Sequence, residues 1–114
     1  MNDQARLVEP DFSVMPQLAP DDMAGIKAAG FASVINNRSD YEGGVSQPTS
    51  AELAEAAQAA GLAYRHLPVP PKGYSDQDAR RMAMLVRSLP KPVLAFCRTG
   101  TRAAALFEKG KLLE

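Results

Sequence analysis

The chain is poor in the residues that build metal centres and disulfides. Its 114 residues include one cysteine, one histidine and no tryptophan. A single cysteine cannot form an internal disulfide, and one histidine with one distant cysteine cannot supply most ligands of a zinc site. We therefore expect no disulfide, no metal and no cofactor. Because no charged and then apolar leader begins the sequence, we expect a reducing, cytoplasmic environment.

Net charge and long apolar runs are also lacking. Thirteen Lys and Arg residues balance thirteen Asp and Glu residues, so no general field attracts nucleic acid or an anionic membrane. No apolar run is long enough to span a bilayer. We expect neither nucleic acid nor membrane as a partner, and any selectivity for anions must be local. The length and ordinary composition indicate one globular domain over residues 1–114.

Signals typical of helices and of strands alternate along the sequence. Thr49 and Glu52 have the spacing of a capping box, and Ser75 begins a second helix with a core-facing stripe. The expected helices cover 20–30, 49–60, 75–89 and 103–107, and the expected strands cover 6–8, 12–14, 31–35, 63–67 and 93–96. The first two strands are expected to form an edge pair, since Pro10 and Asp11 divide them.

This alternation predicts an α/β fold with three layers. A mostly parallel central sheet would be covered by helices on both faces. Ligands of such sheets bind at the carboxyl ends of the strands. Three strand ends should therefore converge, namely 36–40, 68–72 and 97–102.

The last of these strand ends, residues 97–102, carries the strongest chemical signal. It lies between an apolar strand and a helix, so its backbone N–H groups and the helix N-terminus favour a bound anion. The helix dipole, Arg98 and Arg102 would stabilise Cys97 as a thiolate, the nucleophilic form. The alternative is a small buried core residue, which the polar residues that follow Cys97 make less favoured. The substrate-binding groups expected here are Arg98, Thr99, Gly100 and Thr101.

Further segments extend the pattern over nearly the whole chain: Val34-Ile35-Asn36-Asn37-Arg38 with Asp40 and Glu42, Gln47-Pro48, Gly61-Leu62-Ala63-Tyr64, and Leu67-Pro68-Val69. With Cys97–Arg102 they resemble the phosphatase-like domain family of the β-lactamase-hydrolase-like proteins, bacterial relatives of dual-specificity and tyrosine phosphatases. The resemblance implies a phosphatase-type α/β fold, Cys97 as nucleophile and Arg102 as oxyanion clamp. It also implies a possible partner, a fused or separate metallo-β-lactamase-type dioxygenase of sulfide metabolism.

The spacing within the loop differs from that of tyrosine phosphatases. Four residues separate Cys97 from Arg102, whereas tyrosine phosphatases have five. The spacing is similar to that of the rhodanese loop, which carries sulfane sulfur as a cysteine persulfide. A shorter loop should enclose a smaller volume, which suits a sulfur atom better than a phosphoryl group.

A general acid is hard to find in the sequence. A phosphatase protonates its leaving group, yet the turn over residues 68–73 contains no acid. Asp76 and Asp78 have the positions of helix-start residues. Asp40, at a strand end, is the better candidate acid, and a turn-forming role is its alternative. Arg38 is either a second anion contact or the ion-pair partner of Asp40 or Glu42.

The first hypothesis from the sequence is therefore sulfur transfer. Cys97 would take sulfane sulfur from thiosulfate or a small persulfide, because that chemistry needs no general acid. The second is hydrolysis of a phosphate ester through a phosphocysteine, with Asp40 as acid. The third is a catalytically weak module that binds oxyanions or docks to a partner. His66 is expected to be structural rather than a base.

Overall fold

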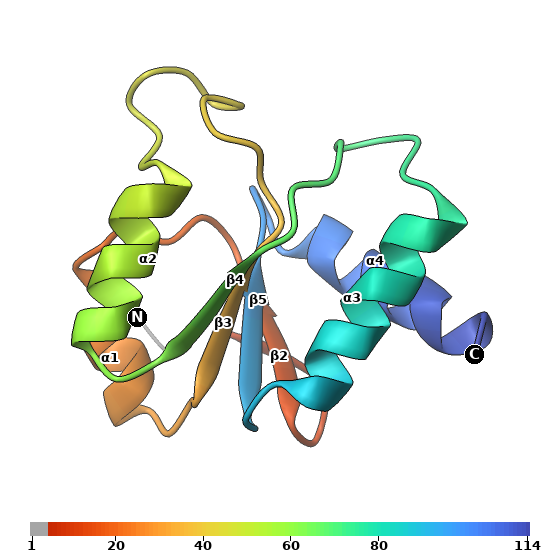
Figure 1. Cartoon of the computed structure of the whole chain (residues 1–114), viewed down its shortest axis with the longest axis horizontal. Helices are drawn as coiled ribbons and strands as arrows, with labels where there is room; N and C mark the ends of the chain where they lie inside the picture. Colours follow the sequence, from red (N-terminus) through yellow and green to blue (C-terminus); the bar gives the residue numbers. More distant parts are fainter. Residues whose placement is uncertain (1–4) are drawn as a thin grey trace.

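A five-stranded sheet lies between two pairs of helices in the computed structural model, which describes residues 5–114 (Figure 1). The strands are β1 (Arg6–Glu9), β2 (Phe12–Met15), β3 (Ser33–Asn36), β4 (Ala63–His66) and β5 (Val93–Phe96). The helices are α1 (Asp22–Ala28), α2 (Ser50–Ala59), α3 (Asp76–Ser88) and α4 (Thr101–Leu112). The strand order is β1-β2-β5-β3-β4, and only β1 runs antiparallel to its neighbour. The predicted three-layer, mostly parallel fold is confirmed.

Two separate cores cover the two faces of the sheet. Helices α1 and α2 lie on one face and α3 and α4 on the other (Figure 1). Successive residues of a strand point to opposite faces, and β5 follows this rule. Leu94 and Phe96 belong to the core below α1 and α2, whereas Val93, Ala95 and Cys97 belong to the other. The cysteine therefore faces α3 and α4 because of its register in the strand.

The place of β2 differs from the prediction of an edge pair. Of these two strands, only β1 is an edge strand, since β2 pairs with β1 on one side and with β5, in parallel, on the other. All four residues of β2 are buried. Short strands of four residues carry too little pattern to tell an edge from an interior position, and only the tertiary pairing decided it.

Helix starts agree with the sequence signals. At α2 the Glu52 N–H donates to Thr49 Oγ1 at 3.2 Å, and the Thr49 N–H donates to Glu52 Oε1 at 2.9 Å. Ser75 and Asp78 form the same reciprocal pair at α3. The structural role expected for Asp78 is therefore confirmed.

Helices α3 and α4 approach each other closely at Gly110. A Cβ atom on Gly110 would lie 2.2 Å from Ala79 O and 2.8 Å from Ala83 Cβ. Contacts this short cannot be relieved by side-chain rotation, because they involve backbone and Cβ atoms. The absence of a side chain at Gly110 thus sets how closely these two helices pack.

Gly110→Ala is expected to destabilise the protein. In an exposed helix the change would stabilise by about 1 kcal/mol, but overpacking at this contact costs roughly 1–3 kcal/mol or more. The melting temperature should therefore fall. Glu108→Ala, at an exposed position of the same helix, is the control and should leave it nearly unchanged. A higher melting temperature for Gly110→Ala would contradict the close packing.

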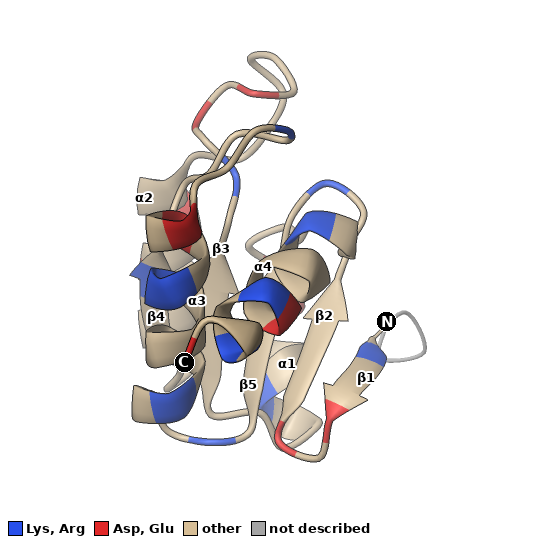
Figure 2. Ribbon diagram, turned by 90° about the vertical axis from the view of Figure 1, so that its right-hand side faces the viewer, with Lys and Arg blue, Asp and Glu red and all other residues tan. Residues whose placement is uncertain are grey.

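Charges of both signs are spread over the surface rather than gathered by sign. Helices α3 and α4 each carry basic and acidic side chains (Figure 2). Within residues 5–114, no helix combines the length and apolar character needed to cross a membrane. The strand ends described next carry a local excess of positive charge, from three arginines and one glutamate.

Candidate active site

The carboxyl ends of β3, β4 and β5 meet at one edge of the sheet, as predicted. The segments that follow them enclose a pocket of about 490 Å³, a size typical of small-molecule sites. Three arginines and one glutamate give the pocket a positive net charge. Its lining consists of Arg38, Glu42, Gly43, Pro71, Arg98 and Arg102.

Cys97 immediately follows β5 and is not among the residues that line this pocket. Its side chain is only 1% exposed, and its Sγ accepts a hydrogen bond from the Gly100 N–H at 3.1 Å. Helix α4 begins at Thr101, so the sulfur lies at a helix N-terminus, where negative charge is favoured. Gly100 has a φ of 91°, and a Cβ there would lie 3.4 Å from the backbone of Met15. Glycine is required for the tight turn that directs this N–H at the sulfur.

Arg102 turns its guanidinium inward, toward the strand ends. Its side chain is 7% exposed. Nη1 donates to Val69 O at 2.9 Å, to Asn37 O at 3.1 Å and to Glu42 Oε1 at 3.0 Å. Nη2 donates to Glu42 Oε2 at 2.9 Å. The end of the guanidinium is thus fixed by two backbone carbonyls and a bidentate carboxylate.

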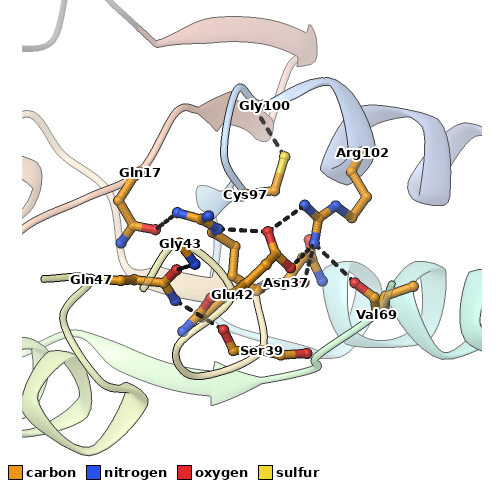
Figure 3. Close-up of polar contacts among 12 residues, drawn as sticks. Gln17, Asn37, Ser39, Glu42, Gly43, Gln47, Val69, Cys97, Gly100 and Arg102 are labelled. Atoms are coloured by element: carbon orange, nitrogen blue, oxygen red, sulfur yellow. Dashed lines mark hydrogen bonds and ion pairs between the residues drawn. The ribbon is translucent and has the colours of Figure 1, made fainter. Parts of the chain in front are cut away.

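One edge of the Arg102 guanidinium remains free. Nε is buried and has no hydrogen-bond partner within residues 5–114. It lies on the same edge of the planar group as the second N–H of Nη2, and two parallel N–H groups match two oxygens of a phosphate or similar anion. Figure 3 shows the Cys97 sulfur on the opposite side of this guanidinium from Val69. A buried, unpaired donor edge of this kind indicates a place for an oxyanion.

Glu42 connects the two buried arginines. Its Oε2 accepts from Arg38 Nε and from Arg102 Nη2, each at 2.9 Å. Hydrogen bonds from Arg102 and then Arg38, opposed by burial, lower the pKa of the Glu42 carboxyl from its usual 4.5 to about 2. Glu42 is therefore ionised at neutral pH. Of the two roles predicted for Arg38, the ion pair is observed, and its partner is Glu42.

The loop between β3 and α2 is shaped to hold Glu42 in this place. The Gly43 N–H donates to Gln47 Oε1 at 2.7 Å, and Gln47 Nε2 donates to Ser39 O at 2.9 Å (Figure 3). A Cβ on Gly43 would lie 2.9 Å from Arg38 Nη2 and 3.0 Å from Gln47 Oε1, so a side chain at this position would require the ends of those two side chains to shift. Tyr41, just before Glu42, adopts a φ of 63°, which is uncommon for a residue other than glycine.

The low pKa of Glu42 predicts how stability depends on pH. A carboxylate whose pKa is lower in the folded state stabilises that state above its unfolded pKa, and this contribution is lost as the pH falls toward about 2. Glu42→Gln should lower the free energy of unfolding at pH 7 by on the order of 2–3 kcal/mol. Urea unfolding measured between pH 7 and pH 2 should show this difference shrinking below about pH 4.5. A difference that stays constant with pH would contradict the assignment.

Asp40 is not brought to the pocket. It is exposed, and its Oδ1 accepts from the Ser50 N–H at 2.7 Å at the start of α2. Although Asp40 follows β3, the chain turns it toward the helix, and the next acid along the loop, Glu42, enters the site instead. The structure therefore does not place the predicted acid near Cys97. His66 Nε2 lies 2.6 Å from Arg38 O, so His66 contacts the backbone of a residue that lines the pocket without lining the pocket itself.

The other predicted binding residues of the loop differ in their exposure and in their relation to the pocket. Arg98 is exposed and contributes to the lining. Thr99 and Thr101 are also exposed, and Thr99 Oγ1 accepts from the Thr101 N–H at 3.4 Å. Of the loop residues, only Arg98 and Arg102 line the pocket, and substrate binding by Thr99, Gly100 and Thr101 stays a prediction.

Sequence reasoning missed Glu42 as a site residue. The available signal was its position four residues after Arg38, which alone does not distinguish a surface pair from a buried one. Gln17 was also missed. Its Oε1 accepts from Arg38 Nη1 at 2.7 Å, and no feature of the local sequence indicates that contact.

Comparisons with known protein sequences point to one family. The sequence profile of the beta-lactamase hydrolase-like protein, phosphatase-like domain, matches residues 4–113. A beta-lactamase hydrolase-like protein of Agrobacterium fabrum is 36% identical over 93 residues, which cover 82% of this chain and 21% of that protein. One from Xylella fastidiosa is 31% identical over 94 residues, covering 82% and 22%. The chain thus spans about a fifth of the length of the curated relatives it matches.

Solved structures agree with the fold. A Neisseria meningitidis protein provisionally described as a phosphatase aligns with a TM-score of 0.83 and 32% identity, covering 90% of this chain and 72% of that one. A Shewanella putrefaciens protein with the same provisional description gives 0.78 and 22%, covering 96% and 70%. Tk-PTP in its active form gives 0.72 and 20%, covering 88% and 65%. The last two likenesses concern the fold alone.

Proposed function

Because the chain belongs to the family of phosphatase-like domains of beta-lactamase hydrolase-like proteins, we propose that it hydrolyses phosphate esters through a cysteine nucleophile. The observation that carries this proposal is Arg102 Nε, a donor that is buried without a hydrogen-bond partner within residues 5–114 and belongs to the same loop as Cys97. The provisional phosphatase description of the Neisseria meningitidis relative supports the same chemistry.

Arg102, Cys97 and Glu42 would have different roles in the proposed reaction. Arg102 would hold two oxygens of the phosphoryl group through Nε and Nη2, while its other N–H groups stay on Glu42 and the backbone. Cys97 would attack the phosphorus as a thiolate stabilised by the Gly100 N–H and the start of α4. Water would then cleave the resulting phosphocysteine. Glu42 acts through Arg102, as a positioning residue.

Sulfur transfer is the second candidate, although the sequence alone put it first. The family and its relatives support phosphate chemistry better. Two observations still favour sulfur: only four residues separate Cys97 from Arg102, and the predicted acid Asp40 lies outside the pocket. In that reaction Cys97 would attack the sulfane sulfur of thiosulfate, and sulfite would leave as an anion. A metallo-β-lactamase-type dioxygenase, fused or separate, remains a proposed partner for this chemistry.

One experiment separates the candidates. The protein is incubated with an aryl phosphate or with thiosulfate, and intact-protein and peptide mass spectrometry identify the group attached to Cys97. Release of phosphate with a phosphoryl group on Cys97 is the expected result. A persulfide on Cys97 with no phosphate release would replace the proposal by sulfur transfer. Binding of vanadate or phosphate without either adduct would indicate an oxyanion-binding module.

A further inference from the structure

Among the described residues that line the pocket, Glu42 is the one acidic group, and it is already engaged in ion pairs. The other described residues that line the pocket are three arginines, one glycine and one proline. Both of its oxygens are held by guanidinium groups at 2.9–3.0 Å. A carboxylate that is held by two cations stays ionised and has no proton to donate. Arginine cannot donate one either, because its guanidinium stays protonated in proteins.

The acids and the histidine nearest the strand ends are engaged elsewhere. Asp40 accepts from the Ser50 N–H at 2.7 Å. Asp78 accepts from the N–H of Ser75 at 3.1 Å, and Asp76 pairs with Lys109 at 3.0 Å. These carboxylates stabilise helix starts or a helix–helix contact. His66 is bonded to a backbone carbonyl. None of them lines the pocket, so the leaving group of a bound substrate has no proton donor beside it.

We propose that the substrates of this site are phosphoryl donors whose leaving group departs as a stable anion, acyl phosphates and phosphates of acidic phenols, and not phosphates of ordinary alcohols. This inference rests on the proposed phosphatase function and narrows its substrate class. An alkoxide is too basic to leave unprotonated at neutral pH, whereas a carboxylate or an acidic phenolate leaves without a proton.

The two steps balance without a general acid. The Cys97 thiolate forms an S–P bond, the P–O bond to the leaving group breaks, and its electron pair leaves as carboxylate or phenolate. Water then forms a P–O bond, the S–P bond breaks, and the thiolate returns. Both protons of that water stay on the released phosphate, one on the new hydroxyl group and the other on another of its oxygens. No oxidant, reductant or metal enters either step.

Arg98 is placed to assist such a leaving group. Its exposed guanidinium lines the mouth of the pocket, whereas Arg102 lines the same pocket with its buried guanidinium. Negative charge that develops on the departing oxygen would emerge toward the mouth, where Arg98 stabilises it without giving up a proton. Arg98→Gln should therefore slow phosphocysteine formation, and added salt should reduce the difference between the two proteins.

The test measures how the rate depends on the leaving group. Phosphocysteine formation is followed in single turnovers with acetyl phosphate, a series from nitrophenyl to phenyl phosphate, and glycerol phosphate. Acetyl and nitrophenyl phosphate should react, and phenyl phosphate should react more slowly. Glycerol phosphate should react more slowly than nitrophenyl phosphate by roughly 10²–10⁴-fold, which is the rate enhancement that a positioned general acid supplies. Asp40→Asn, which keeps an oxygen for the Ser50 N–H, should leave this dependence unchanged.

The outcomes separate this inference from the proposed function. Glycerol phosphate reacting nearly as fast as nitrophenyl phosphate would overturn the substrate class and leave the phosphatase function intact. A steeper dependence on the leaving group in Asp40→Asn would identify Asp40 as an acid and would also overturn it. Absence of a phosphocysteine with every donor, acetyl phosphate included, would overturn the phosphatase function and this inference together.

Discussion

Cys97→Ser is expected to abolish turnover, by at least roughly 10⁴-fold, while the fold remains intact. A serine hydroxyl is not ionised at neutral pH, and the one carboxylate among the described residues that line the pocket, Glu42, is already held by Arg38 and Arg102. The oxygen can still accept the Gly100 N–H that now donates to the sulfur at 3.1 Å. The loss should therefore reflect the nucleophile and not the structure.

Two measurements on Cys97→Ser separate chemistry from folding. The rate of phosphate release from an aryl phosphate reports the first, and thermal unfolding reports the second. Binding of inorganic phosphate should persist, because Arg102 and the loop backbone are unchanged. Turnover that survives in Cys97→Ser with the parent protein's rate would exclude every covalent mechanism considered for this site.

Arg102→Lys should lower kcat by roughly 10²–10³-fold, the effect of removing a preorganised donor to the transition-state oxygens. Lysine keeps the charge but not the planar group, so it cannot hold Glu42 and an oxyanion at once. Two buried carbonyls, of Asn37 and Val69, would also lose donors at 3.1 and 2.9 Å. Each lost hydrogen bond is expected to cost on the order of 1–3 kcal/mol in the free energy of unfolding.

Arg98→Lys is the matched control for Arg102→Lys. It makes the same chemical change in the same loop, but at an exposed arginine whose guanidinium donates to no backbone carbonyl within residues 5–114. Its effect on kcat should be much smaller, and its free energy of unfolding should stay close to that of the parent. Urea unfolding and steady-state kinetics on both variants test this. Equal losses of kcat would show that charge alone, and not the buried bidentate geometry, serves the reaction.

The local elements could be predicted because their causes are local. The reciprocal pair of Thr49 and Glu52 starts α2 within four residues of sequence. The Gly100 turn behaves likewise: a left-handed φ of 91° requires glycine, and the sequence supplies one between strand and helix. Alternation of such elements is enough to predict a mostly parallel sheet, since short crossovers place helices on its faces. The predicted convergence of three strand ends follows from the same rule and is observed.

Predictions that depended on which of two similar residues turns inward were less successful. Asp40 and Glu42 lie two residues apart in one loop, and sequence reasoning chose Asp40 as the acid. The structure turns Asp40 to the N-terminus of α2 and Glu42 to Arg38 and Arg102. That outcome depends on Gln47, Gly43 and the backbone of Tyr41, whose joint effect has no short-range signature.

The amino-acid sequence by itself determined the layers of the fold and the position of the loop from Cys97 to Arg102 between a buried strand and a helix. These follow from apolar periodicity and from steric limits on single residues, which act over a few positions. Only the tertiary structure decided that β2 is an interior strand, and that Glu42 holds Arg102 with one donor edge free. Those features come from contacts between residues 60 to 81 positions apart in the sequence, whose energies exist only once the chain has folded.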